Sequence, residues 1–321
     1  MKIAEWARKE FFVAIVFLLL SVTFASLLFN SLDHHYTYLI QERFNLGGLD
    51  NFSGARILSI MALNAIAVFG FSVKFSSQIL VVLATFGVLF AFRSLLESSS
   101  GISRLRASLL SPAILIPMVW NYIILSGILF PEDIPALLLF ILGLTYLFKR
   151  KMYAFHIVFL LAIVNRESSI FLLPAMFLIQ VGKRDLLKLI VHVLILAGIW
   201  YGVKILLMHF FGGGMDAPLY LNTFSPNLAF CKSIINLNPK VLRLLMLFGG
   251  LWIVLPFCYG KAPNRLLLLT LMLPVFFAIM VYVGNLDHES RIFTEMIPVV
   301  AAPPILLFNR KLDSFHANTS F

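Results

Sequence analysis

Long apolar runs separated by short polar stretches make up almost the whole chain, from residue 11 to residue 308. A helix needs about 20 apolar residues to cross the hydrocarbon core of a bilayer, and several of these runs approach that length. No polar stretch is long enough for a separate soluble domain, so we expect one all-α, polytopic membrane domain over residues 1–321. The expected transmembrane helices, about ten in number, are residues 11–30, 77–92, 107–126, 134–148, 152–164, 168–181, 189–210, 241–259, 266–283 and 292–308.

Small basic groups recur between these runs and predict the topology. Under the positive-inside rule each group marks a cytoplasmic loop, so an even number of spans must separate neighbouring groups. This parity places both termini in the cytoplasm. The basic groups are Lys2/Arg8/Lys9, Arg93/Arg104/Arg106, Lys149/Arg150/Lys151, Lys183/Arg184/Lys188, Lys261/Arg265 and Arg310/Lys311.

One further apolar run, 57–73, does not fit the parity. It contains Asn64 and Ser72, and we expect it to be an interfacial or re-entrant segment within a long first outer loop, 31–76. If this run crosses the membrane instead, the chain has one more span and the parity breaks. A second long outer loop is expected at 211–240.

The runs 152–164 and 168–181 are short for full spans. One continuous helix through both would put Lys149 and Lys183 on opposite sides of the membrane. We therefore expect two short helices that meet at Asn165-Arg166-Glu167, slightly below the membrane surface.

Composition agrees with a membrane protein and excludes other classes. Hydrophobic residues make up 60% of the chain and charged residues 12%, against roughly 45–50% and 25% in a soluble domain. The net charge of +10 does not indicate nucleic-acid binding, because the basic residues are divided among the loops and are not gathered on one soluble face. The only cysteines, Cys231 and Cys258, fall on opposite sides of the predicted membrane, which argues against a disulfide or a cysteine metal site.

Acidic residues gather on the expected non-cytoplasmic side, and the positive-inside rule says little about Asp and Glu. Asp33-His34-His35 opens the first outer loop, where Asp33 would serve as a general base toward a hydroxyl group; a plain polar helix end is the alternative. Glu132 and Asp133 open a span, where they either contact substrate or cap the helix, a cap contributing roughly 0.3–1 kcal/mol per charge.

Two further clusters lie on the same side. Arg166 and Glu167 are costly at membrane depth and favour a pocket or pathway, unless they form a mutually neutralised pair that closes the hairpin. Arg166 also carries the fork of donors that suits a phosphate. Asp287-His288-Glu289 would suit a divalent cation, whereas Arg291 and Glu295 are spaced for an intrahelical ion pair.

Taken together, the clusters resemble the GT-C superfamily of integral membrane glycosyltransferases. The resemblance covers most of the chain through short, degenerate motifs: an acid soon after the first span, a second acidic motif opening a later span, an Arg-Glu hairpin and an acidic entry to a late span. The matching stretches are Leu32-Asp33-His34-His35-Tyr36, Glu132-Asp133-Ile134-Pro135-Ala136-Leu137, Asn165-Arg166-Glu167-Ser168 and Glu289-Ser290-Arg291-Ile292-Phe293-Thr294-Glu295-Met296-Ile297-Pro298.

The resemblance implies an enzyme that takes a sugar from a polyprenyl-phosphate carrier and passes it to an acceptor on the non-cytoplasmic face, with Asp33 as catalytic base. It implies substrate contacts at His34, Glu132, Asp133, Arg166, Glu167, Glu289 and Arg291, with the two arginines on the carrier phosphate. We accordingly expect a multi-pass protein of the bacterial cytoplasmic membrane with its active site on the outer face.

This chain departs from the family pattern in two ways. It is short and lacks the large soluble C-terminal domain of the oligosaccharyltransferases. Asp33-His34 replaces the usual Asp-x-Asp or Glu-x-Asp pattern, which leaves a divalent cation as a candidate cofactor only. The alternatives are a lipid-linked saccharide polymerase or ligase, and a transporter or flippase whose intramembrane charges would mark a path. A transporter would be expected to show inverted repeats, which are not apparent in the sequence.

Overall fold

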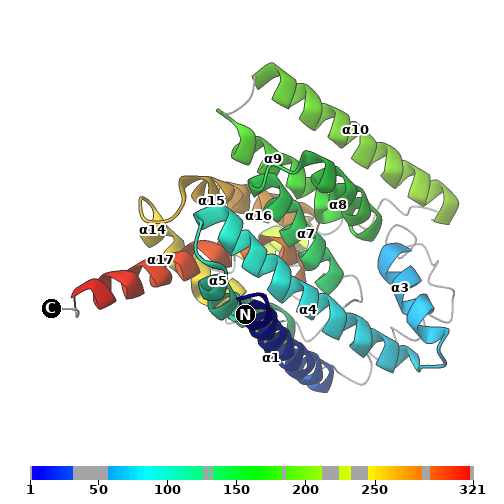
Figure 1. Cartoon of the computed structure of the whole chain (residues 1–321). Helices are drawn as coiled ribbons and strands as arrows, with labels where there is room; N and C mark the ends of the chain where they lie inside the picture. The colour runs from blue at the N-terminus through cyan, green and yellow to red at the C-terminus, as the bar shows by residue number, and fades with distance from the viewer. Residues whose placement is uncertain are drawn as a thin grey trace.

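The computed structural model describes residues 2–31, 57–125, 130, 133–182, 186–211, 224–232, 245–283 and 290–318. Helices account for 90% of the structure and the described part contains no strand, which confirms the predicted all-α class (Figure 1). The elements are α1 (Lys2–Ser31), α3 (Ile57–Ala67), α4 (Val73–Ser100), α5 (Arg104–Leu110), η1 (Ser111–Ile114), α6 (Leu115–Val119), the π-helical η2 (Trp120–Ile124), α7 (Asp133–Phe148), α8 (Met152–Asn165), η3 (Glu167–Phe171), α9 (Leu172–Gln180), α10 (Leu186–Phe211), α12 (Phe224–Lys232), η5 (Leu247–Val254), α14 (Leu255–Cys258), α15 (Asn264–Leu269), α16 (Met272–Val283), η6 (Ser290–Met296) and α17 (Ile297–Asn318).

Several helices have the length and composition of membrane spans. Within the described ranges, 5 stretches qualify. Shorter apolar helices accompany them, so a multi-pass membrane protein is supported, and ten crossings stay a prediction. The qualifying stretches are Trp6–Ser31, Val73–Ser100, Arg104–Ile124, Leu186–Leu207 and Asn264–Tyr282.

Helix α4 forms the centre of the bundle and packs against α1 and α7 (Figure 1). Its start is capped by Ser72, whose side chain accepts a hydrogen bond from the amide of Phe75 at 3.3 Å. Its end is closed by Gly101, which has a left-handed φ of 72° that favours glycine. Both boundaries therefore follow from local sequence.

The relative directions of these helices follow from their contacts. Helix α1 runs antiparallel to α4, because Glu10 pairs with Arg93 while Phe17 packs on Phe90. Helix α7 runs parallel to α4: Thr145 donates to the Ala91 carbonyl, and Lys149, directly after the end of α7, donates to Ser94, farther along α4. The ends of α4 and α7 and the start of α1 thus lie together.

We call this the basic end of the bundle, defined by Arg93, Arg104, Lys149, Arg265 and Arg310. Glu10 joins α1 to α4 and α5 through ion pairs of 3.0 Å to Arg93 and 2.8 Å to Arg104. Arg265 donates to the Ile179 carbonyl at 2.9 Å, and Arg310 donates to the Lys261 carbonyl. Residues from separate predicted cytoplasmic loops therefore meet at one end, in agreement with the parity argument.

The run 57–73 forms α3, whose 11 residues reach roughly 16 Å, about half of a bilayer core. A turn with Gly70 at φ 82° separates it from α4. Ser59 of α3 donates to Asn165 at the end of α8 at 2.5 Å, so α3 packs beside the predicted hairpin corner. The segment is too short to cross as a helix, and its interfacial position stays a prediction.

The predicted hairpin consists of two short helices, as expected. Helix α8 ends at Asn165, and Arg166 adopts an extended backbone with φ −161° and ψ 144° before η3 and α9 begin. Other segments are less regular than the sequence suggested. The expected span 241–259 contains η5 and α14 with a break at Phe248, and the expected loop 211–240 contains α12, which Asn227 joins to the Val281 carbonyl at 2.9 Å.

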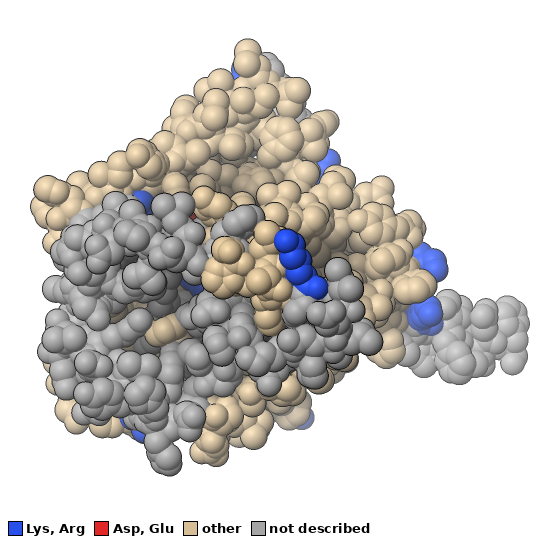
Figure 2. Space-filling model, turned by 180° about the vertical axis from the view of Figure 1, so that it is seen from behind, with Lys and Arg blue, Asp and Glu red and all other residues tan. Residues whose placement is uncertain are grey.

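The surface agrees with a lipid environment. Helix α10 lies at the edge of the bundle beside α8 and is mostly exposed, with Leu194 and Phe210 among its large exposed side chains (Figure 1). The face drawn in Figure 2 is dominated by uncharged residues in the part that is described, with Lys and Arg at scattered points.

Candidate functional site

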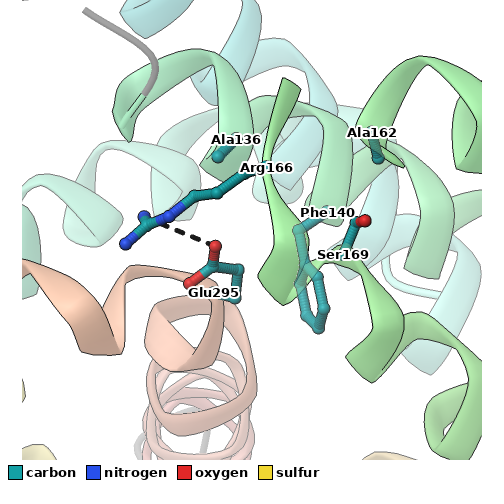
Figure 3. A pocket seen from close by; sticks show the side chains of 6 residues that line it. All are labelled: Ala136, Phe140, Ala162, Arg166, Ser169 and Glu295. Carbon is teal, nitrogen blue, oxygen red and sulfur yellow. Dashed lines mark ion pairs between the residues drawn. The ribbon is translucent and has the colours of Figure 1, made fainter. Parts of the chain in front are cut away.

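An ionic cluster of Asp133, Arg166 and Glu295 lies at the end of the bundle opposite the basic end. Asp133 is the first residue of α7, Arg166 is the extended residue between α8 and η3, and Glu295 lies in η6 before α17. Nη1 of Arg166 is 3.2 Å from Oδ1 of Asp133 and 3.4 Å from Oε1 of Glu295. Figure 3 shows the guanidinium directed at the Glu295 carboxylate. One guanidinium thus joins three segments that are far apart in the sequence.

Burial makes this cluster energetically important. The relative exposures of Asp133, Arg166 and Glu295 are 0%, 6% and 1%. Buried charges are costly unless they are paired, and removing one partner of a buried pair costs about 3–5 kcal/mol. The two carboxylates and one guanidinium therefore hold each other at the start of α7, the hairpin corner and the start of α17.

Hydrogen bonds orient each carboxylate. Asp133 accepts a bond from the Phe130 amide at 2.9 Å and donates its own amide to the Phe130 carbonyl at 3.0 Å. Asp133 thus lies in the first turn of α7, and the same side chain also binds Arg166. Ser168 donates its hydroxyl to Oε1 of Glu295.

A second layer of contacts supports η6. Tyr122 is fully buried in η2, and its hydroxyl lies 2.6 Å from the hydroxyl of Thr294, the neighbour of Glu295. The adjacent Asn121 accepts the amide of Phe248 at 2.8 Å, and Phe248 has a left-handed φ of 58°. A π-helical turn widens the helix and is frequent at functional sites. Here it directs consecutive side chains toward η5 and η6.

A separate ion pair involves Glu167 and Lys204. Lys204 lies in the apolar helix α10 with 3% of its surface exposed, and its Nζ is 3.5 Å from Oε1 of Glu167. The Glu167 side chain is 39% exposed. Trp200 of α10 donates to the Glu167 carbonyl at 3.1 Å. Two cations therefore lie at the hairpin corner: Arg166 belongs to the corner and faces the bundle, and Lys204 reaches the corner from α10.

The cavity at the ionic cluster is small. It is lined by Ala136, Phe140, Ala162, Arg166, Ser169 and Glu295 (Figure 3) and has a volume of about 10 Å³. This is roughly the space of one water molecule. The cluster can order a water but cannot hold a sugar or a phosphate within this cavity, so it is a support for a site and not a substrate pocket by itself.

The predicted site residues divide into three groups. Asp133 and Arg166 are brought into contact, while Glu167 lies beside them and faces Lys204. Arg291 lies in η6, where only its backbone is described. Outside the described residues lie Asp33, His34, Glu132 and Glu289.

Two functional candidates were missed or misjudged from the sequence. The i, i+4 spacing offered Glu295 a local partner in Arg291, and the structure shows that the carboxylate pairs with Arg166 across the fold. Spacing along one helix cannot reveal such a contact. Lys204 could have been identified from the sequence, because it is an isolated charge within the long apolar run 189–210.

Among the described residues no group of three or more His, Cys, Asp or Glu side chains converges. The candidate cation ligands Asp287 and Glu289 lie outside those residues. Neither cysteine is in a disulfide: Cys258 is buried and Cys231 is partly buried.

Comparison with known proteins gives no relative: no family model, no curated protein and no solved structure matches the chain.

Proposed function

We propose that this chain is an inverting membrane glycosyltransferase of the GT-C type, which moves a sugar from a polyprenyl-phosphate carrier to an acceptor at the non-cytoplasmic face. One observation carries the proposal: Asp133, Arg166 and Glu295, each from a separate motif of the resemblance, meet in a buried ionic cluster at the end of the bundle opposite the basic end. Three buried charges at one end of an apolar bundle are costly, and such groups in membrane segments usually serve function.

The cluster fixes the ends of the segments that carry the other proposed residues. Glu132 directly precedes Asp133 in the chain, and Arg291 lies one turn before Glu295. Asp33 follows Ser31, the last residue of α1, which by its antiparallel packing on α4 ends away from the basic end. The described segments that adjoin these residues therefore begin or end at the same end of the bundle, which supports the proposal.

In the proposed reaction Asp33 takes the proton from the acceptor hydroxyl, and the oxygen of that hydroxyl bonds to the anomeric carbon of the sugar. The bond from that carbon to the carrier phosphate oxygen breaks, and the phosphate leaves with the electron pair. Cations near the phosphate stabilise the developing charge. Arg166 already binds two carboxylates. We therefore infer that Lys204, which reaches the partly exposed Glu167 carboxylate at 3.5 Å, and Arg291 would serve as these cations.

The test is a transfer assay with the purified full-length protein. The protein is incubated with a panel of polyprenyl-phosphate sugars, and loss of sugar from the carrier is measured. We expect turnover with at least one donor, abolished by Asp33→Asn while the variant stays in the membrane fraction. Asp50→Asn, the same change in the same predicted loop, should retain activity. Turnover with no donor would overturn the proposal, and activity of Asp33→Asn would remove Asp33 from its role.

The transporter alternative has one observation in its favour. Phe248, Gly249 and Gly250 break an apolar segment with left-handed backbone, and broken helices often line transport paths. The charges argue against this function, because Asp133, Arg166 and Glu295 lie at helix ends and not along a path through the bundle. Reconstituted vesicles that move a lipid-linked sugar between leaflets without cleaving it would favour the transporter.

A further inference from the structure

Two histidines face each other between α8 and α10, away from the ionic cluster. Nε2 of His156 is 2.9 Å from Nε2 of His192, and the two ring centroids are 5.0 Å apart. Both side chains are half-buried, and each lies within two turns of the start of its helix, toward the basic end. The pair therefore lies toward the expected membrane surface.

The distance between the two nitrogens suits chelation. With metal-to-nitrogen bonds of about 2.0–2.1 Å, two nitrogens 2.9 Å apart subtend roughly 90° at the metal, the angle between neighbouring ligands in the tetragonal geometry of Cu²⁺ or Ni²⁺. A tetrahedral Zn²⁺ needs roughly 3.3 Å between them, which is a small opening of the pair. The two Nε2 atoms now face each other across a hydrogen bond, so metal binding replaces that bond, and each ring turns to direct its lone pair at the metal.

We propose that His156 and His192 form a two-imidazole site for a divalent transition metal of the nickel, copper and zinc group, which joins α8 to α10. No further His, Cys, Asp or Glu completes the site within the described residues, so the protein supplies two ligands and water fills the other positions. Lys188 lies one turn before His192 and opposes a cation. The site therefore favours metals with high intrinsic affinity for imidazole, of which Cu²⁺ is the strongest.

Metal binding at this site would restrain helix α10. This helix is mostly exposed, and Trp200 and Lys204 attach it to Glu167 at the hairpin corner. A metal on His156 and His192 would attach its other half to α8. The inference does not depend on the proposed transferase activity.

The experiment uses the full chain purified with a tag that contains no histidine. Cu²⁺ is titrated and bound metal is counted, and the copper spectrum is recorded by electron paramagnetic resonance. We expect one equivalent of copper that is lost in both His156→Ala and His192→Ala, with splitting from two nitrogen ligands in the unmodified protein. Copper should also raise the unfolding temperature in proportion to occupancy. His209→Ala, on the same helix, is the matched control and should bind as before.

A second variant separates metal binding from a hydrogen bond between the rings. His192→Gln keeps a polar group that can bond to His156 but removes the imidazole ligand. A folded His192→Gln protein that has lost the copper equivalent supports the site. Equal copper binding by the unmodified protein, His192→Gln and both alanine variants overturns it, as does a copper spectrum with a single nitrogen ligand that is unchanged by substitution.

Discussion

Arg166 and Glu295 lie in contact between the hairpin corner and the start of the last helix, with 3.4 Å between Nη1 and Oε1. The same nitrogen is 3.2 Å from Asp133. The guanidinium of Arg166 therefore links three segments at the end of the bundle opposite the basic end. A planar group can meet two carboxylates in this way, whereas an ammonium acts as a point charge.

Replacement of Arg166 should test this closure directly. We expect Arg166→Met to lower the free energy of unfolding by about 3–5 kcal/mol, because two buried carboxylates lose their shared cation. Arg166→Lys should recover only part of the loss. The measurement is denaturant unfolding in detergent, followed by circular dichroism.

A charge-free variant provides the control. The triple replacement Asp133→Leu, Arg166→Met and Glu295→Leu removes the buried charges together, and such exchanges are often neutral or stabilising. It should be more stable than Arg166→Met alone. If Arg166→Met is as stable as the unmodified protein, the cluster does not hold the bundle end.

Lys204 gives a different prediction, because its role is proposed to be functional. Lys204→Met keeps the length of the side chain and removes a charge buried in an apolar helix, so we expect unfolding stability to be unchanged or higher. The Michaelis constant for the polyprenyl-phosphate donor should rise at least tenfold. Lys188→Met on the same helix, near the basic end, should leave it unchanged. A variant that loses stability but keeps donor affinity would assign Lys204 a structural role.

The left-handed backbone in η5 predicts that alanine substitution at two glycines has opposite effects on stability. Gly249 has φ 66°, and a Cβ there would lie 2.7 Å from the Trp120 ring, so Gly249→Ala should be destabilising through both backbone strain and overlap. Gly198 lies within α10 with open space around it. Gly198→Ala should stabilise by about 0.5–1 kcal/mol, because alanine loses less backbone freedom in a helix. Thermal unfolding of the two variants side by side checks the contrast.

The sequence predicted the parts of the fold that depend on hydropathy and local breaks. The apolar runs gave the helices, and the polar residues Asn165-Arg166-Glu167 gave the hairpin corner, since charges cannot continue an apolar helix at that depth. Basic residues from separate loops lie at one end of the bundle, while the number of crossings and the side of the membrane stay predictions. The sequence did not predict the left-handed turn at Phe248, because this turn depends on the contact with Asn121. It did not predict helix α12 either, because α12 depends on the contact with Val281.

The candidate site was predictable only in part, for a related reason. Asp133 and Arg166 carry charges in apolar surroundings, so their cost marks them in the sequence. The sequence did not predict that Glu295 is the partner of Arg166. Glu295 is also spaced for a local pair with Arg291, and helix spacing alone cannot decide between a local and a distant partner. Tyr122 resembles any other aromatic residue of a membrane helix, and only its contact with Thr294 gives it a role.

That contact provides the last prediction. Tyr122→Phe removes one buried hydrogen bond to Thr294, and we expect a loss of about 0.5–1.5 kcal/mol in unfolding stability. Because Thr294 adjoins Glu295, the proposed transfer rate should fall more than this loss of folded protein explains. Tyr259→Phe is the matched control: Tyr259 bonds to Thr270 at 3.1 Å, away from the cluster, and is 54% exposed. Removal of the Tyr259 hydroxyl should leave both the unfolding stability and the transfer rate nearly unchanged. If the two variants lower turnover equally at equal amounts of folded protein, Tyr122 does not position the cluster.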